Sequence, residues 1–115
     1  MRRGEIWLID LDPAQGSEAS KHRPAVIVSN NGANTTATRL GRGVLTVVPV
    51  TSNTTRVYPF QVLLPTGTTG LDRESKAQAE QVRSVDVKRI QRRMGYLPGP
   101  TLTLLDEALR IHLGL

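Results

Sequence analysis

The run Ala25-Val26-Ile27-Val28, directly after the pair Arg23-Pro24, most constrains what this chain can fold into. Four consecutive apolar residues, three of them β-branched, predict a buried strand. Pro24 fixes its own backbone and restricts Arg23 to extended conformations. Because a polar segment of small and charged residues, Ala14 to His22, comes first, we expect a mobile loop that delivers Arg23 to the lip of this strand. From these residues alone, an ordinary loop-to-strand junction with a solvated arginine is the alternative.

Four apolar runs predict strands. The first two are expected to pair as a hairpin with a long tip, since only a polar segment separates them. Pro49 and Pro59 interrupt the last two runs, and because proline cannot donate to a ladder, each is expected at an edge, a bulge or a strand exit. The predicted strands are Glu5–Leu11, Arg23–Ser29, Val44–Val50 and Val57–Leu64.

Three further segments have weaker patterns. Asn30 to Gly43 lacks an apolar period, so we expect a connection with room for a turn of helix around Thr36 to Arg39. Ser75 to Val82 fits a strand or a helix, because good helix formers coexist with a polar alternation of period two. The basic stretch from Val85 to Tyr96 is predicted to turn near Asp86-Val87 into a last short strand.

A terminal helix follows the break at Gly99-Pro100. Thr101 or Thr103 can cap it, and Thr103 and Asp106 have the spacing of a capping box. Leu105, Ala108, Leu109 and His112 would share one face, and Gly114 would end the helix. The whole chain, residues 1–115, is therefore predicted to be a single domain, mainly β with antiparallel strands and a C-terminal α-helix.

The charge indicates a polyanionic partner. The net charge is +5, and 12 of the 15 basic residues are arginine, whose planar fork binds phosphate bidentately. Aromatic residues make up only 3% of the chain, which argues against a platform for stacking bases. There is no cysteine and nothing that resembles a signal peptide, so we expect a soluble, cytoplasmic protein without thiolate chemistry and without a membrane partner.

Metal-free RNA cleavage is the reaction that requires the fewest catalytic groups from this chain. The chain has two histidines and no acidic cluster at ligand spacing, so no metal site and no cofactor are predicted. In such cleavage the ribose 2'-OH is the nucleophile, and the protein has to align it and stabilise charge on the phosphate. Arg23 and the hydroxyls of Thr51-Ser52 would supply this if the two strand ends meet.

Five fragments, in this order, together resemble the MazF/PemK family of toxin endoribonucleases: RGEIWLIDLDPAQGSE, KHRPAVIVS, VVPVTS, YPFQV and EQVRSVD. The resemblance implies a compact SH3-like β-barrel of the CcdB/PemK kind that forms a homodimer. It also implies sequence-selective, metal-independent cleavage of single-stranded RNA that leaves a 2',3'-cyclic phosphate and a 5'-OH. An acidic antitoxin of the MazE type, acting through a disordered C-terminal segment, would be the inhibitor.

The resemblance also assigns roles. Arg23 of the Arg-Pro pair and Thr51 of the Pro-x-Thr-Ser motif match the main catalytic residues. Ser52 would lie beside the scissile phosphate, and Glu18 and Lys21 match loop positions over the RNA. Gln81 is a further candidate, which could read a base or, as an ordinary buried glutamine, satisfy backbone groups.

The proton shuttle is left open between Arg23, His22 and Glu80. The chain departs here from PemK-like relatives, which carry a histidine after the loop glycine where this sequence has Ser17. Neighbouring residues of a strand point to opposite faces, so His22 is not expected to face the RNA if Arg23 does.

Two functions of other classes fit the same fold. The related CcdB-type barrels are non-catalytic toxins that bind DNA gyrase, and a passive RNA-binding barrel is the third alternative. The pairing of Arg23 with Thr51-Ser52 separates them, because a pure binder has no need to bring these groups together.

Overall fold

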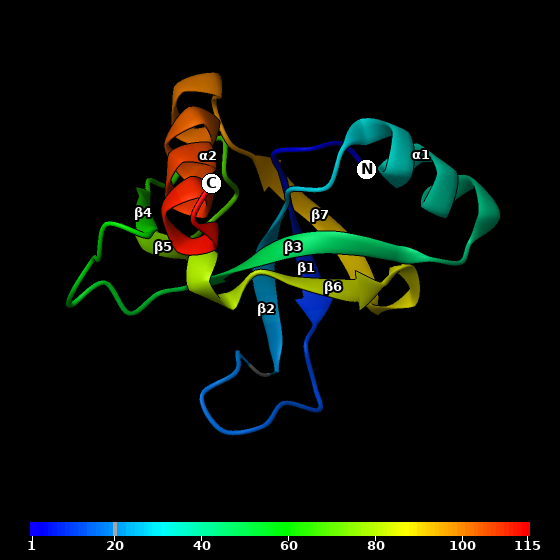
Figure 1. Ribbon diagram of the computed structural model, residues 1–115, viewed down its shortest axis with the longest axis horizontal. Helices are drawn as coiled ribbons and strands as arrows, with labels where there is room; N and C mark the ends of the chain where they lie inside the picture. The colour runs from blue at the N-terminus through cyan, green and yellow to red at the C-terminus, as the bar shows by residue number, and fades with distance from the viewer. Residues whose placement is uncertain (20) are drawn as a thin grey trace.

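The computed structural model describes residues 1–19 and 21–115, so Ser20 of the predicted loop lies outside the described residues. It contains two α-helices, two short 3-10 helices and seven strands, shown in Figure 1. The helices are α1 (Asn31–Leu40), α2 (Gly99–Leu113), η1 (Ala79–Gln81) and η2 (Val87–Arg89). The strands are β1 (Glu5–Asp10), β2 (His22–Ile27), β3 (Val44–Thr51), β4 (Gln61–Leu64), β5 (Ser75–Gln78), β6 (Arg83–Asp86) and β7 (Ile90–Tyr96).

The strands form one antiparallel sheet in the order β4-β5-β3-β2-β1-β7, with β6 paired to β3 outside this path. The predicted hairpin is confirmed, since β1 and β2 pair antiparallel up to Asp10 opposite His22. The buried parts of the central strands β2 and β3 are continuously apolar because both of their faces are covered. Val26 and Val48 belong to a core cluster that includes residues of α2, whereas Ile27 and Val47 belong to a second cluster that includes Ala37 of α1.

Strand β3 changes partner along its length. Its first half, Val44 to Val47, pairs with β6, and its last two residues, Val50 and Thr51, pair with β5. Pro49 lies between these two ladders and is in register with Ala25 of β2. Of the places expected for Pro49, an edge, a bulge or a strand exit, the edge of the sheet is excluded because β2 pairs beside it. Its missing N–H coincides with the change of partner near the end of β3.

The sheet is antiparallel with a C-terminal helix, as predicted, but it is not a closed barrel. Among the described strands, β4 and β7 end the path without pairing to each other. The strands β4 and β5 are four residues long, and α2 packs against β4 and η1 (Figure 1). A helix therefore covers this end of the sheet where a closing ladder would otherwise lie.

Helix α1 corrects the prediction of a connection over Asn30 to Gly43. Asn30 caps the helix by accepting a hydrogen bond from the Ala33 N–H at 2.8 Å, and Gly41 ends it in the left-handed region at φ 66°. Only Asn34 and Ala37 are buried. The helix has no wide apolar face, so its capping residues were the one signal in the sequence.

Helix α2 begins earlier than predicted. Its N-cap is Pro98, no side chain caps it, and the Thr103 hydroxyl instead donates to the Gly99 carbonyl at 3.1 Å. The predicted capping box is therefore wrong, because the helix already begins at Gly99 with Pro100 in its first turn, so Thr103 lies inside it. Gly114 ends the helix as predicted. Of the predicted face, Leu105 and Ala108 are buried, Leu109 is partly buried and His112 is exposed.

The structure also settles the remaining predicted segments. Ser75 to Val82 is strand β5 followed by the 3-10 turn η1, so the two patterns seen in the sequence belong to successive elements. The predicted strand Val57–Leu64 is wrong for its first half, since β4 begins at Gln61 and Pro59 lies in the turn before it. The last strand ends at Tyr96.

An ion pair joins β1 and β7, at the end of the sheet opposite to β4. The Arg93 guanidinium donates to Glu5 at 2.9 Å, and the Trp7 indole donates to the same carboxylate. Burial raises the pKa of Glu5, but hydrogen bonds from the Arg2 amide, from Trp7 and from Arg93 together outweigh it and leave this pKa below its ordinary value. In the described part of the chain, no helix is long and apolar enough to cross a membrane.

Candidate active site

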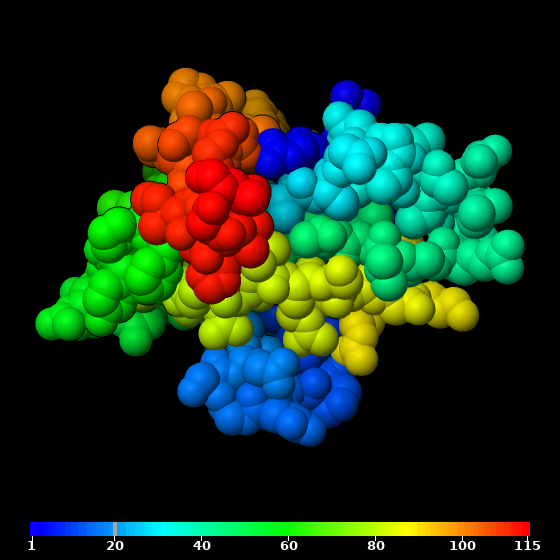
Figure 2. Space-filling model, in the orientation of Figure 1, coloured from blue at the N-terminus to red at the C-terminus, as the bar shows by residue number. Residues whose placement is uncertain are grey.

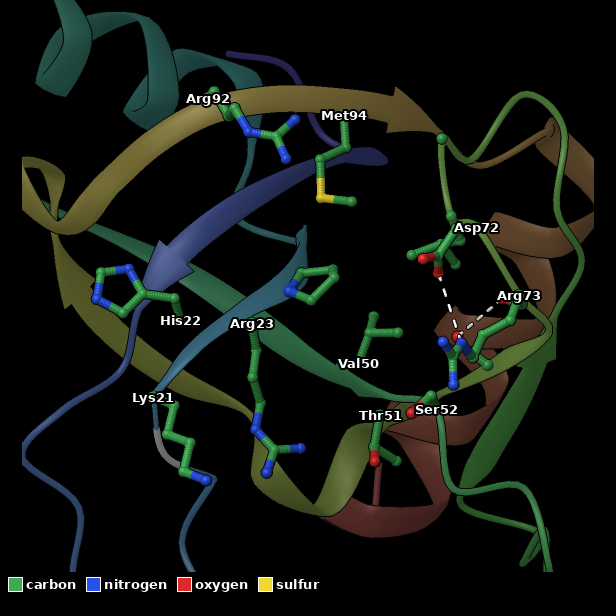
Figure 3. A pocket seen from close by; sticks show the side chains of 14 residues that line it. Lys21, His22, Arg23, Val50, Thr51, Ser52, Asp72, Arg73, Arg92 and Met94 are labelled. Carbon is green, nitrogen blue, oxygen red and sulfur yellow. Dashed lines mark hydrogen bonds and ion pairs between the residues drawn. The ribbon is translucent and has the colours of Figure 1, made fainter.

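A pocket of about 680 Å³ opens where β2 begins and β3 ends (Figure 3). Residues Lys21 to Pro24 line one side, and Val50 to Ser52 line the floor beside them. The loop from Gly70 to Arg73, Ser75 at the start of β5, and Arg92 and Met94 of β7 complete the wall. The pocket therefore brings together residues far apart in the sequence, at the strand ends where the chemistry is expected.

Arg23 and Thr51 meet at this pocket because of the strand register. The ladder between β2 and β3 ends with Ala25 opposite Pro49, and Arg23 and Thr51 each lie two residues beyond this pair on their strands. Both residues are half-buried, and in Figure 3 their side chains extend to the same side of the strands. The geometry thus brings a guanidinium and a hydroxyl to one place, and Ser52 adds a second hydroxyl next to them.

His22 also lines the pocket, but its ring points away from the Arg23 side chain, as strand alternation predicts (Figure 3). Its Nδ1 lies 3.0 Å from the Oε1 of Gln91, at the edge of β7. This contact orients the imidazole at the rim of the pocket. The ring is exposed to solvent.

Two further arginines belong to the site and were not among the predicted residues. Arg73 lies in the loop before β5 and Arg92 in β7, and both are exposed. With Lys21 and Arg23 they give the lining four cationic side chains against one carboxylate, that of Asp72. The sequence shows Arg92 only as part of a basic stretch that suggests a solvated face, and nothing near Arg73 marks it. The resulting charge favours a phosphate-bearing ligand.

The described part of the loop before β2, Leu11 to Ala19, projects from the body at the bottom of Figure 2, in blue, and is held by side chains of other elements. Arg89 donates to the carbonyl groups of Asp10 and Asp12, and Arg83 donates to the Leu11 carbonyl at 3.3 Å. The Asp12 carboxylate in turn accepts the Lys21 N–H at 2.8 Å.

Lys21 itself has φ 66°, the one positive value recorded for a residue other than glycine in the described ranges, 1–19 and 21–115. Such a conformation costs about 1 kcal/mol or more, and it persists only where the surroundings hold it. Here the Asp12 carboxylate and the Leu11 N–H, which donates to the Lys21 carbonyl at 2.9 Å, hold the backbone. The lysine next to the strand end is therefore fixed in position.

Gln81 fastens the tip of the same loop. Its Oε1 accepts the Ala19 N–H at 3.0 Å and its Nε2 donates to the Ser17 carbonyl at 2.9 Å. Both ends of the amide are thus used by loop backbone, which favours the second of the two roles considered for Gln81. Glu18 accepts the Gln15 N–H within the loop, and neither Gln81 nor Glu18 lines the pocket. Their contact with RNA stays a prediction.

Replacing Gln81 with alanine is expected to release the loop. Two net hydrogen bonds, each worth about 1 kcal/mol, would be lost, so opening should become about thirtyfold more frequent. Trypsin cleavage after Lys21 under native conditions measures this opening. Gln78→Ala is the control, since Gln78 is a nearby glutamine that pairs with Gln61 in the ladder between β4 and β5 and not with the loop. Equal cleavage rates in Gln81→Ala and the unmodified protein would contradict the bracing role.

Glu80, the other acid–base candidate, lies away from the pocket lining. Its Oε2 accepts a hydrogen bond from the Gln61 Nε2 at 2.7 Å, while its Oε1 is buried without a hydrogen-bond partner. The pocket thus unites five of the eight predicted residues, Lys21, His22, Arg23, Thr51 and Ser52, and leaves Glu18, Glu80 and Gln81 outside. In the ranges that the structure describes, no group of three or more histidine or acidic residues could hold a metal ion.

The fold and the site together define a small antiparallel sheet protein with a cationic pocket for a phosphate-bearing ligand. The comparison with protein families identifies the family to which this protein belongs. The model of the PemK-like, MazF-like toxins of type II toxin-antitoxin systems matches residues 2–113, and the chain belongs to this family.

Individual relatives agree with this assignment. The chain is 64% identical over 115 residues to the endoribonuclease MazF9 of Mycobacterium tuberculosis, and the match covers 100% of this chain and 98% of the relative. Among solved structures, it resembles MazF from Deinococcus radiodurans with a TM-score of 0.83 at 26% identity, over 100% of this chain and 97% of the other. A mycobacterial endoribonuclease in complex with its cognate antitoxin has the same fold, with a TM-score of 0.77, 22% identity and coverage of 100% and 96%.

Proposed function

We propose that this protein is an endoribonuclease toxin that cleaves single-stranded RNA at the pocket between the ends of β2 and β3. The observation that carries the proposal is the meeting of Arg23 with Thr51 and Ser52 in a lining of four cationic side chains. The relative that is 64% identical bears the name of an endoribonuclease, which supports the same activity here. This favours an enzyme over a gyrase-binding toxin or a passive RNA-binding protein.

The reaction needs no group beyond the RNA and these side chains. The ribose 2'-oxygen attacks the adjacent phosphorus, the bond from phosphorus to the 5'-oxygen breaks, and the products are a 2',3'-cyclic phosphate and a 5'-OH. The 2'-OH loses one proton and the departing 5'-oxygen gains one, so the atoms balance. As charge builds on the phosphate oxygens, the Arg23 guanidinium stabilises it.

Thr51 and Ser52 would orient the phosphate for this displacement. A hydroxyl donates a hydrogen bond to a non-bridging oxygen without adding charge, and half-buried Thr51 is fixed at the end of a central strand. Of the three predicted acid–base candidates, Arg23 and His22 line the pocket and Glu80 does not. We assign the proton transfers to His22, whose ring points away from Arg23 (Figure 3) and has to turn toward the phosphate to act. A guanidinium stays protonated in proteins, which suits Arg23 to charge stabilisation and not to proton transfer.

The partners follow from the family and the charge. Complexes named MazE-MazF are among the similar solved structures, so we infer an acidic antitoxin segment that competes with RNA for the cationic pocket. We also propose a homodimer, in which a second copy would extend the RNA-binding surface. RNA is the substrate, so the cytoplasm is the proposed place of action.

A long mixed-sequence RNA incubated with the purified protein in excess EDTA tests the reaction. Cleavage is expected, with new ends that carry 5'-OH and 2',3'-cyclic phosphate. Once a cut site is mapped, an oligonucleotide with a single 2'-deoxy residue on its 5' side should resist cleavage entirely, because it lacks the nucleophile. Intact RNA in EDTA, or ends that carry a 5'-phosphate, would overturn the proposed mechanism.

A further inference from the structure

The segment between β3 and β4 carries a stack of planar side chains on its surface, and the mechanism above does not use it. The rings of Tyr58 and Phe60 lie parallel, with centroids 5.4 Å apart and planes 3° from each other. The Arg56 guanidinium carbon lies 5.7 Å from the centroid of the Tyr58 ring. This segment projects from the body on the left of Figures 1 and 2, in green.

The planar groups are accessible. Tyr58 is 41% exposed, Phe60 is half-buried and Arg56 is exposed. The chain has only four aromatic residues, so two of them stacked at one exposed turn concentrate its capacity for binding planar ligands. Nucleobases stack on aromatic rings and on arginine guanidinium planes, and such stacking tolerates any base.

The stack is also held in place by buried groups. Lys76, only 8% exposed, donates from its Nζ to the Arg56 carbonyl at 2.6 Å. Gln61 accepts the Tyr58 N–H at 3.1 Å and donates in turn to Glu80. A turn fixed in this way loses little conformational freedom when a ligand binds. This gives Glu80 and Lys76 a structural purpose outside the pocket.

The stack follows the active-site end of β3 along the chain. Two side chain to backbone hydrogen bonds lead away from Thr51, from the Asn53 N–H to the Thr51 hydroxyl at 3.3 Å and from the Thr55 N–H to the Asn53 amide oxygen at 3.2 Å. Arg56 follows directly, and five residues of chain span at most ~18 Å. Arg56 therefore lies no more than ~18 Å from the phosphate position at Thr51.

We propose that Arg56, Tyr58 and Phe60 form a stacking site for a nucleobase of the RNA strand, a short distance along the strand from the phosphate that is cut. The arginine contributes a charge for the neighbouring phosphate and a plane for the base, and the two rings support it. The scarcity of aromatic residues argued against a base-stacking surface, but here two of the four lie together. The proposal rests on the proposed function for the nature of the ligand.

Binding of a mixed-sequence oligonucleotide with 2'-O-methyl groups throughout tests the site, because this probe lacks the nucleophile and is bound without being cut. Tyr58→Leu is expected to weaken binding about tenfold, since it removes the ring that supports the Arg56 plane and a stacked base contributes on this scale. Tyr58→Trp, which keeps a planar ring, should bind at least as tightly as the unmodified protein. Unchanged melting temperatures establish that both variants are folded.

Tyr96→Leu is the matched control. Tyr96 is 46% exposed and has the Arg93 guanidinium 6.0 Å from its ring centroid, but it lies at the end of β7, outside the pocket lining. Its loss should leave binding unchanged. Equal affinity of Tyr58→Leu and the unmodified protein, or equal losses in the leucine and tryptophan variants, would overturn the stacking site. So would a Tyr58→Leu variant that changes only the oligomeric mass, since the stack would then be a protein interface.

The two proposals fail in different experiments. If the reaction is wrong, the unmodified protein leaves long RNA intact in EDTA. If the stacking site is wrong, the unmodified protein cleaves RNA, and Tyr58→Leu still binds the uncleavable probe with full affinity.

Discussion

Arg23→Ala is expected to lower the cleavage rate constant by about 100- to 1000-fold while RNA affinity falls much less. Removal of one preorganised donor from the charge that develops in a transition state has an effect of this size. Arg23 is held at the lip of β2 by Pro24 and by the ladder to β1, where Ile9 is its register partner. Because the side chain is presented from a fixed strand, its loss should not be compensated by movement of its neighbours.

Single-turnover cleavage of a mapped RNA site, together with binding of the uncleavable probe, separates the two effects. Arg23→Lys should recover part of the rate, since it restores the charge without the planar fork. Arg92→Gln is the matched control, because it removes an arginine of the same pocket that we assign to attracting the RNA. It should weaken binding and leave the rate constant nearly unchanged. If Arg23→Ala cleaves at the normal rate, or loses only affinity, Arg23 is not the group that stabilises the transition state.

The predicted parts of the fold are those where burial and periodicity agree. The β-branched run after Arg23 is continuously apolar because core clusters cover both faces of β2, so the strand could be recognised without knowing its partners. Only one turn of helix α1, around Thr36 to Arg39, could be predicted, because only Asn34 and Ala37 are buried in the helix and no apolar face marks its full length. The sequence could not show that the barrel-like sheet is open between β4 and β7, because strand pairing at the ends of a sheet depends on contacts between distant segments, which local patterns do not contain.

The site divides in the same way. The sequence could suggest Arg23 with Thr51-Ser52, because both stand at the ends of strands that proved to be neighbours. It could not suggest Arg73 and Arg92, since their place in the lining depends on how the loop before β5 packs against β7. The distinction between the two roles of Gln81 likewise required the position of a loop 62 residues earlier in the chain. Residues that act through contacts between distant segments are thus the ones that the fold adds to the site.

Gly70→Ala is expected to destabilise the protein by about 3 kcal/mol or more, among the largest effects of a single methyl group in this chain. A Cβ at Gly70 would lie 2.0 Å from the carbonyl oxygen of Met94 in β7, and the residue has φ +72°. Backbone of the loop and of the strand would both have to move. Because Leu71, Asp72 and Arg73 follow directly and line the pocket, RNA binding should weaken together with stability.

Gly67→Ala in the same loop separates the clash from the backbone strain. Gly67 also has a positive φ, +94°, but a Cβ there would meet no atom within 4 Å. Only the conformational cost of about 1 kcal/mol should appear, with RNA affinity retained. Denaturant unfolding gives both free energies, and the uncleavable probe gives the affinities. Equal free energies of unfolding in the two variants would mean that the loop does not need its close approach to β7. The loop that carries Arg73 would then be held in position by other contacts.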